Sequence, residues 1–280
     1  MALLANILSI SSQVVYGHVG NSAAGFALGL LGHEVWAIPT VLLSHHPGHG
    51  RPFGRQTSPE EIVGHVQALE AHGWLAGCDA VMSGYLANAG QADAVLEVVA
   101  RVKRANPRAI FFCDPILGDE DTGSYTAPEI AIVTRELVAL ADIISPNLFE
   151  LGILSAQKPQ TTQDAVLLAR GLGPQIVAVT TAFAPEGRIA SLIVTPDRAL
   201  RVETTRHFPA QRGTGDVFAG ILLGKLLEGA DGGTALAHAA GATADMVGAS
   251  LALGRDELAL AQLQHLVIKP DTYPALEILV

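Results

Sequence analysis

The segment Arg212-Gly213-Thr214-Gly215-Asp216 leads directly into Val217-Phe218-Ala219-Gly220-Ile221-Leu222-Leu223, an apolar stretch of helical composition. A glycine-rich turn with one carboxylate at the start of a helix has two interpretations. In the first, Asp216 only caps the helix by accepting hydrogen bonds from its unpaired N–H groups. In the second, bare N–H groups and the positive end of the helix dipole form an anion site. Because such turns are common, the pentapeptide alone favours the cap, and the choice depends on the rest of the chain.

Composition limits the classes of function. The chain has 280 residues, of which 49% are hydrophobic and 16% charged, enough for one large α/β domain or two smaller ones. Its formal net charge is −10 and it contains no run of Lys or Arg, which excludes a general nucleic-acid or acidic-membrane surface. An anionic substrate would therefore need a local site made of backbone amides. Cys78 and Cys113 lie in apolar surroundings and resemble small buried hydrophobes of a reducing cytosol.

The N-terminal segment is uncharged up to Glu34, which raises the question of a signal peptide or a membrane span. It has no basic n-region, and polar residues interrupt its apolar run. A span requires about 20 mainly apolar residues. We therefore expect a cytoplasmic protein with no membrane partner.

The hydrophobic pattern predicts strands that alternate with helices. The expected strands are 6–11, 34–38, 80–82, 110–113, 142–145, 176–180, 189–194 and 200–203. The expected helices are 21–31 (opened by an Asn21 cap), 58–71, 89–104, 128–140, 148–154, 162–170 and most of 213–263. Apolar strands of this kind indicate a mainly parallel sheet that is covered on both faces. No linker or repeat divides the chain, so we expect a single domain over residues 1–280.

Polar residues and glycines follow four of the expected strands, in the segments 11–21, 83–85, 114–119 and 146–150. In parallel sheets, ligands bind beyond the carboxyl ends of the strands, so four such loops together favour a site. The GxGxxG and P-loop patterns are absent from the sequence. If the protein uses ATP, it holds the phosphates in another way.

Five segments resemble pyridoxal kinases of the ribokinase-like superfamily, in particular the bacterial branch. They are residues 6–24, Cys78–Leu86, Phe112–Gly118, Ile144–Leu151 and Gly213–Asp216, and they keep the family's order and spacing. The resemblance implies a three-layer α/β/α ribokinase-like fold and ATP-dependent phosphorylation of the 5′-hydroxymethyl group of pyridoxal in vitamin B6 salvage. It names pyridoxine and pyridoxamine as further candidate substrates, Mg²⁺ and K⁺ as candidate ions, and a homodimer as the expected assembly.

The resemblance also implies roles for individual residues. Asp216 would be the catalytic base, and Gly213, Thr214 and Gly215 would present backbone amides to the transferred phosphoryl group. Ser12, Tyr85 and Val19 would line the vitamer pocket. Asp114 and Glu150 would organise Mg²⁺ directly or through water, and the ATP-binding set would consist of Asp114, Ser145, Asn147, Glu150, Thr180, Gly213 and Gly215. Taken alone, Asp114 fits a turn aspartate and Glu150 a first-turn helix charge.

The loop after the second expected strand departs from the family. Pro47 and Gly48 occupy the places where pyridoxal kinases commonly carry a Thr that reaches toward the substrate. His45, His46 and His49 lie in the same loop. We interpret them as part of a flexible loop over the vitamer site, because no Cys or carboxylate joins them as a metal ligand. That one of them takes over the lost contact is a hypothesis. Thr180 stands where some relatives carry Lys.

Three other functions remain open. A hydroxymethylpyrimidine kinase of thiamin precursor metabolism shares the fold, but such sites usually place a cysteine beside the glycine turn, whereas this chain has Val217. A non-catalytic vitamer-binding protein would have no need of Asp216. A sugar kinase would have more hydrogen-bonding side chains around its substrate.

Overall fold

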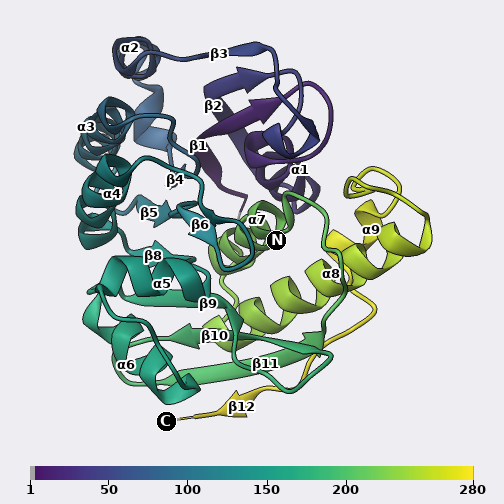
Figure 1. Ribbon diagram of the computed structural model, residues 1–280. Coiled ribbons are helices and arrows are strands. Elements are labelled where there is room, and N and C mark those ends of the chain that lie inside the picture. The colour runs from purple at the N-terminus through teal and green to yellow at the C-terminus, as the bar shows by residue number, and fades with distance from the viewer. Residues whose placement is uncertain (1–3, 280) are drawn as a thin grey trace.

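A twisted sheet forms the middle layer of the molecule, and helices cover both of its faces (Figure 1). The computed structural model describes residues 4–279. Within that range the main sheet has the strand order β12-β11-β10-β9-β8-β5-β4-β1-β2-β3. Its strands are β1 (Asn6–Val14), β2 (Glu34–Leu43), β3 (Gly54–Gln56), β4 (Ala80–Ser83), β5 (Ile110–Cys113), β8 (Ile143–Ile144), β9 (Ile176–Ala182), β10 (Arg188–Val194), β11 (Ala199–Thr205) and β12 (Glu277–Ile278). The strands from β2 to β9 pair in parallel, and antiparallel strands complete both edges.

Each face of the sheet has its own hydrophobic core. One core packs under α2 (Pro59–Ala71), α3 (Ala89–Ala105), α4 (Pro128–Leu140), α5 (Leu148–Ser155) and α6 (Thr162–Gly171). The other packs under α1 (Ala24–Leu30), α7 (Thr214–Leu227), α8 (Gly232–Ala252) and α9 (Gln264–Ile268). Successive strand residues point to opposite faces, so Phe111 belongs to the first core and Phe112 to the second. Strands buried in this way read as continuous apolar runs in the sequence. The expected three-layer fold with a mainly parallel sheet is confirmed.

The C-terminal helical region differs from the expectation of nearly continuous helix over 213–263. It contains two long helices, and the chain from Leu253 to Leu263 consists mostly of turns. Asp231 starts α8 by accepting a hydrogen bond from Thr234 N at 3.0 Å. Gly254 follows the C-cap with φ +65°, the left-handed conformation that terminates helices at glycine.

The expected Asn21 cap is wrong. Residues Gly20–Ser22 form a short 3₁₀ turn, and α1 begins at Ala24. The buried Asn21 amide instead donates to Ser11 O at 3.1 Å and to Ile38 O at 3.3 Å. These carbonyls lie near the bulge where β1 and β2 shift register, so Asn21 satisfies backbone groups of the sheet rather than those of a helix.

Some short elements were not expected from the sequence. Besides β3 and β12, these include the hairpin formed by β6 (Gly118–Asp119) and β7 (Gly123–Ser124). In the part of the chain that the structure describes, no helix has both the length and the apolar character needed to cross a membrane.

The strand order determines where a ligand can bind. β1 lies between β2 and β4, so the chain leaves β1 toward one side of the sheet and later continues from β4 toward the other. In open parallel sheets, the crevice beyond the carboxyl ends of two such strands is the usual ligand site. Ser12 lies near the carboxyl end of β1, and Tyr85 lies in the loop after β4.

Candidate active site

The glycine turn lies at the N-terminus of α7. Gly213 is the N-cap and has φ +81°. A Cβ there would lie 1.8 Å from His18 O, so only glycine fits this position. A Cβ at Gly215 would have no neighbour within 4 Å in the described part of the chain, so the space beside the turn is open. The first N–H groups of a helix have no intrahelical acceptor and lie at the positive end of its dipole. The turn can therefore bind an anion.

Asp216 lies in the first turn of α7 and is half-buried. Burial raises its pKa to about 6, and hydrogen bonding to the backbone of Gly20 and of Asp216 itself partly opposes that rise. The carboxylate is thus connected to the loop after β1 and does more than cap its own helix. A carboxylate whose pKa lies near the working pH suits a general base.

Asp114 follows β5 and is buried, and Ser145 Oγ donates to its Oδ1 at 3.0 Å. Burial raises the pKa of Asp114 well above its usual range, and the negative charges of Glu150 and Asp216 raise it further. The structure therefore brings Asp114, Glu150 and Asp216 into one electrostatic neighbourhood, although they lie in different segments of the chain.

Glu150 is part of a capping box that starts α5. Its Oε2 accepts from Asn147 N at 2.9 Å, and its Oε1 accepts from Leu117 N at 2.8 Å. Asn147 Nδ2 in turn donates to Gly118 O at 2.7 Å. Burial raises the pKa of Glu150 to about 7 despite these backbone hydrogen bonds. Glu150 and Asn147 therefore hold the turn after Asp114 in place, and their roles toward metal and nucleotide stay predictions.

Strained backbone occurs on both sides of this region. Thr180 N donates to Pro146 O at 2.9 Å, which joins the end of β9 to the loop that carries Asn147. The next residue, Thr181, has φ +52°, and Ile116 in the turn after Asp114 has φ +41°. Left-handed conformations at β-branched residues are rare and concentrate at functional sites.

The predicted vitamer pocket lies at the β1–β4 switch point. Ser11 Oγ accepts from Tyr85 N at 3.2 Å, so the loop after β4 packs on the end of β1. Ser12 packs on the turn that holds Val19, because a Cβ at Gly20 would lie 2.2 Å from Ser12 O. The structure thus brings Ser12, Val19 and Tyr85 to one end of the sheet. Their contacts with a substrate stay predictions.

The histidines of the loop after β2 have separate partners. His46 Nδ1 accepts from Gly48 N at 2.9 Å and caps the short turn Pro47–His49. His49 Nε2 pairs with Glu257 Oε1 at 2.5 Å. Among residues 4–279, no group of three or more His, Cys, Asp or Glu side chains has metal-binding geometry. Gly48 lies beside Arg212, since a Cβ there would be 3.2 Å from Arg212 Nε. The loop is therefore next to the glycine turn.

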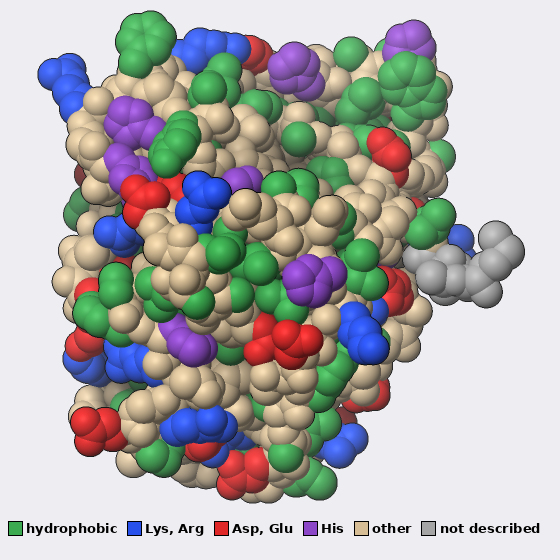
Figure 2. Space-filling view, turned by 90° about the vertical axis from the view of Figure 1, so that its right-hand side faces the viewer, with side chains coloured by type: hydrophobic (Ala, Val, Ile, Leu, Met, Phe, Trp, Pro, Cys, Tyr) green, Lys and Arg blue, Asp and Glu red, His purple; other side chains and the backbone are tan. Residues whose placement is uncertain are grey.

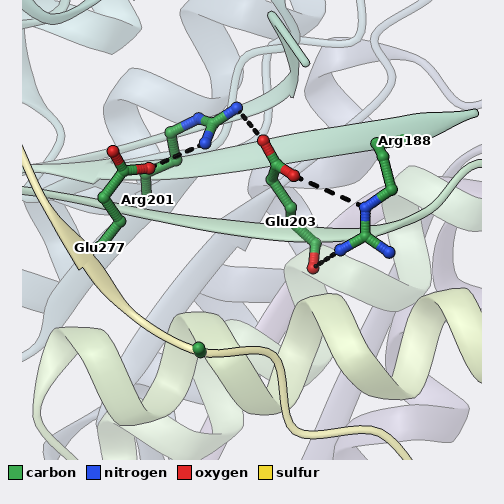
Figure 3. A pocket seen from close by; sticks show the side chains of 5 residues that line it. Arg188, Arg201, Glu203 and Glu277 are labelled. Atoms are coloured by element: carbon green, nitrogen blue, oxygen red, sulfur yellow. Dashed lines mark hydrogen bonds and ion pairs between the residues drawn. The ribbon is translucent and has the colours of Figure 1, made fainter. Parts of the chain in front are cut away.

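Two cavities differ in their relation to these residues. The larger, of 290 Å³, lies on the outer strands β10, β11 and β12 and is lined by Arg188, Arg201, Glu203, Ala275 and Glu277. Its charged side chains pair with one another (Figure 3), for example Arg201 with Glu277 at 2.8 Å. None of the predicted site residues lines it. A smaller cavity of 170 Å³ is lined by Gly48 and Arg212 among others and adjoins the glycine turn. The predicted anion-binding turn therefore lies beside the smaller cavity and not beside the larger one.

One face of the molecule carries charges of both signs. On the face drawn in Figure 2, Lys and Arg side chains are interspersed with Asp and Glu. On this face the charges therefore do not form a patch of one sign.

A carboxylate beside bare helix amides, at the switch point of a parallel sheet, is the arrangement that phosphoryl transfer to a small alcohol requires. The fold and the site thus define the class of ribokinase-like small-molecule kinases. Comparison with known proteins agrees, because residues 59–260 match the family model for phosphomethylpyrimidine kinase, and the chain belongs to this family of phosphotransferases.

Solved structures extend the likeness over the whole chain. The pyridoxal kinase of Leishmania donovani, in complex with ADP and ginkgotoxin, is 30% identical, with 98% of this chain and 99% of that chain covered and a TM-score of 0.92. The same kinase with ADP and pyridoxine has a TM-score of 0.93 at 28% identity, with 98% and 99% covered. The pyridoxal kinase of Trypanosoma brucei is 27% identical, with both chains covered to 100% and a TM-score of 0.89.

Proposed function

We propose that the protein transfers the γ-phosphoryl group of ATP to the 5′-hydroxymethyl group of pyridoxal, giving pyridoxal 5′-phosphate in vitamin B6 salvage. Pyridoxine and pyridoxamine are further candidate acceptors. The observation that carries the proposal is the Asp216 carboxylate, whose pKa burial raises to about 6, next to the open amides of the glycine turn. The pyridoxal kinases with ADP bound, which share fold and length with this chain, support it.

The acceptor side uses the β1–β4 switch point. Asp216 removes the proton of the hydroxymethyl group as the hydroxyl oxygen of the vitamer attacks the γ-phosphorus, and the bond from that phosphorus to ADP breaks. The amides of Gly213, Thr214 and Gly215 stabilise the charge on the phosphoryl group, helped by the α7 dipole. Ser12, Val19 and Tyr85 hold the vitamer ring, with Pro47 and Gly48 on the loop above it.

The nucleotide side uses the loops after β5, β8 and β9. Asp114, Ser145, Asn147, Glu150 and Thr180 border the triphosphate of ATP. Asp114 and Glu150 fit Mg²⁺, because burial raises the pKa of both carboxylates and a hard cation would favour their charged forms. When bound, Mg²⁺ would neutralise charge on the phosphates. K⁺ is a further candidate activator.

We also propose a cytoplasmic homodimer. Supporting this, β3 is an exposed edge strand, and apolar residues beside it are open to solvent, with Phe53 88% and Val15 79% exposed. Light scattering coupled to gel filtration would report about twice the 29.1 kDa chain mass for a dimer.

A second candidate function is phosphorylation of a hydroxymethylpyrimidine in thiamin precursor metabolism, which the match of residues 59–260 to the phosphomethylpyrimidine kinase family favours. The buried Val217 stands where such enzymes usually carry a cysteine. A competition assay with both acceptors would rank the two by kcat/KM.

The decisive experiment is a spectrophotometric assay for pyridoxal 5′-phosphate with ATP, Mg²⁺ and pyridoxal, in which the natural chain is compared with Asp216→Asn. A positioned base contributes about 10²–10⁴-fold, so the variant should lose turnover by that factor. Turnover that survives the substitution would leave the kinase assignment intact and refute the role of Asp216. Binding of pyridoxal without turnover in the natural chain would establish a vitamer-binding protein instead.

A further inference from the structure

One carboxylate outside the predicted site connects three segments around it. Glu257 is buried and lies in the turns after α8. Its Oε2 accepts from His18 N at 3.1 Å, and its Oε1 pairs with His49 Nε2 at 2.5 Å. Its backbone forms a parallel bridge with that of Arg212. One side chain thus joins the loop after β1 to the loop after β2, beside the segment that precedes Gly213.

The loop after β1 lies against both the glycine turn and the candidate base. His18 O packs against Gly213, where a Cβ would approach it to 1.8 Å. Two residues further on, the Gly20 backbone is close enough to the Asp216 carboxylate to lower its pKa. The glycine at position 17 makes room for this connection, because a Cβ there would lie 2.5 Å from Glu257 Oε2. A shift of the Glu257 carboxylate would therefore displace the loop that contacts both the anion site and the base.

The loop after β2 reaches Glu257 through His49. The turn Pro47–His49 lies over the glycine segment, with Gly48 against the Arg212 guanidinium. The hydrogen bond between His49 and Glu257 anchors the end of this turn. Hydrogen bonds to a charged group contribute more than neutral ones, and losing one partner of a buried pair is costly.

We propose that Glu257 is a positioning residue with two separable effects. Through His49 it holds residues 45–50 over the acceptor pocket, and through His18 it holds the loop that supports Gly213 and Asp216. The identity of the acceptor rests on the proposed function, whereas the connection between the loops does not. The first effect acts on the KM of the acceptor, and the second on kcat.

The kinetic test uses four variants. His49→Phe removes only the contact with the loop after β2 and should raise the pyridoxal KM about tenfold, with kcat and the ATP KM unchanged. Glu257→Ala should raise the same KM and also lower kcat tenfold or more. Glu257→Gln has the same length and keeps an acceptor oxygen for His18 N–H, so it should recover most of kcat. Asp197→Asn is the matched control, because it removes one charge from an exposed residue in the turn between β10 and β11, outside the cavity beside the glycine turn, and should change neither constant.

Hydrogen exchange of the free protein tests the connection without any substrate. Amides in residues 44–53 should exchange faster in both His49→Phe and Glu257→Ala, and those in residues 16–20 only in Glu257→Ala. Unchanged exchange in both segments, or a lower melting temperature with unchanged kinetic constants, would overturn the proposal. If Glu257→Ala does not fold, Glu257→Gln and His49→Phe still give the comparison. Failure of the natural chain to phosphorylate pyridoxal would refute the acceptor alone, and the exchange pattern would then decide the positioning role.

Discussion

At the scale of single residues, Asp216 gives the reaction a predicted pH dependence. Its pKa is about 6 because of burial, and a base acts only when it is ionised. With both substrates well below saturation, the rate reports ionisation of the free enzyme. We expect it to rise with pH through an apparent pKa near 6 and to level off above it. The Asp216→Asn variant should lack this limb, and a rate independent of pH between about 5 and 8 in the natural chain would contradict the assignment.

The same shift predicts a cost in stability. The folded-state pKa of Asp216 is raised from 3.8 to about 6, so between these values the unfolded chain releases a proton that the folded chain retains. The free energy of unfolding therefore falls as pH rises through this window, by about 3 kcal/mol for a shift of this size. Asp216→Asn lacks this contribution. Its stability relative to the natural chain should therefore rise between about pH 4 and pH 6 and stay higher above that range.

Denaturant titrations of both proteins at several pH values measure this difference. Asp245→Asn is a suitable control, because Asp245 on α8 bonds Thr272 away from the glycine turn. A stability difference between Asp216→Asn and the natural chain that stays constant with pH would mean that Asp216 ionises normally.

At the scale of elements, the start of α7 separates a structural glycine from a functional one. Gly213→Ala would force φ +81° on alanine and drive its Cβ into His18 O, so we expect a loss of stability and of activity together. Gly215→Ala meets open space within a helix and should raise stability by up to about 1 kcal/mol. If the phosphoryl group approaches this turn, the methyl group will still lower kcat. Thermal melts and kinetics on the two variants give the comparison, and full activity in Gly215→Ala would place the phosphate elsewhere.

The same scale shows which elements the sequence predicts well. The bounds of β5 and α4 agree with the expectation. Pro115 follows β5 by two residues and Pro128 is the first residue of α4, so a proline marks where the one element ends and the other begins. The Asn21 cap failed because the partners of its side chain, Ser11 and Ile38, belong to two different strands. The hairpin of β6 and β7 has strands of two residues, too short for any periodicity to show.

At the scale of the whole molecule, the candidate site could be predicted only where its residues lie in local motifs. The glycine turn and the loops after β4, β5 and β8 were found in this way. Glu257 was missed because its partners His18 and His49 lie 239 and 208 residues away, and no motif surrounds it. Contacts between residues that lie far apart in the chain leave no local pattern in the sequence.

The two buried carboxylates that are candidate Mg²⁺ ligands predict that the ion and the nucleotide bind together. Asp114 and Glu150 are the two candidate Mg²⁺ ligands, and Glu150 already accepts two short backbone hydrogen bonds. The phosphates of ATP should therefore supply most of the ligands that Mg²⁺ needs. Millimolar Mg²⁺ alone should barely change the melting temperature. MgATP at 100 times its dissociation constant should stabilise the fold by about 2.7 kcal/mol, which corresponds to roughly 5 °C for a chain of this size.

Thermal melts with Mg²⁺, with ATP and EDTA, and with MgATP distinguish these cases. Asp114→Asn should reduce the additional stabilisation that Mg²⁺ gives over ATP alone, since it removes a carboxylate from the site. It should also stabilise the free protein at neutral pH, because burial and the neighbouring negative charges raise the pKa of Asp114 and ionising it is costly. A full increase in melting temperature with Mg²⁺ in the absence of nucleotide would show instead that the folded chain binds the ion by itself.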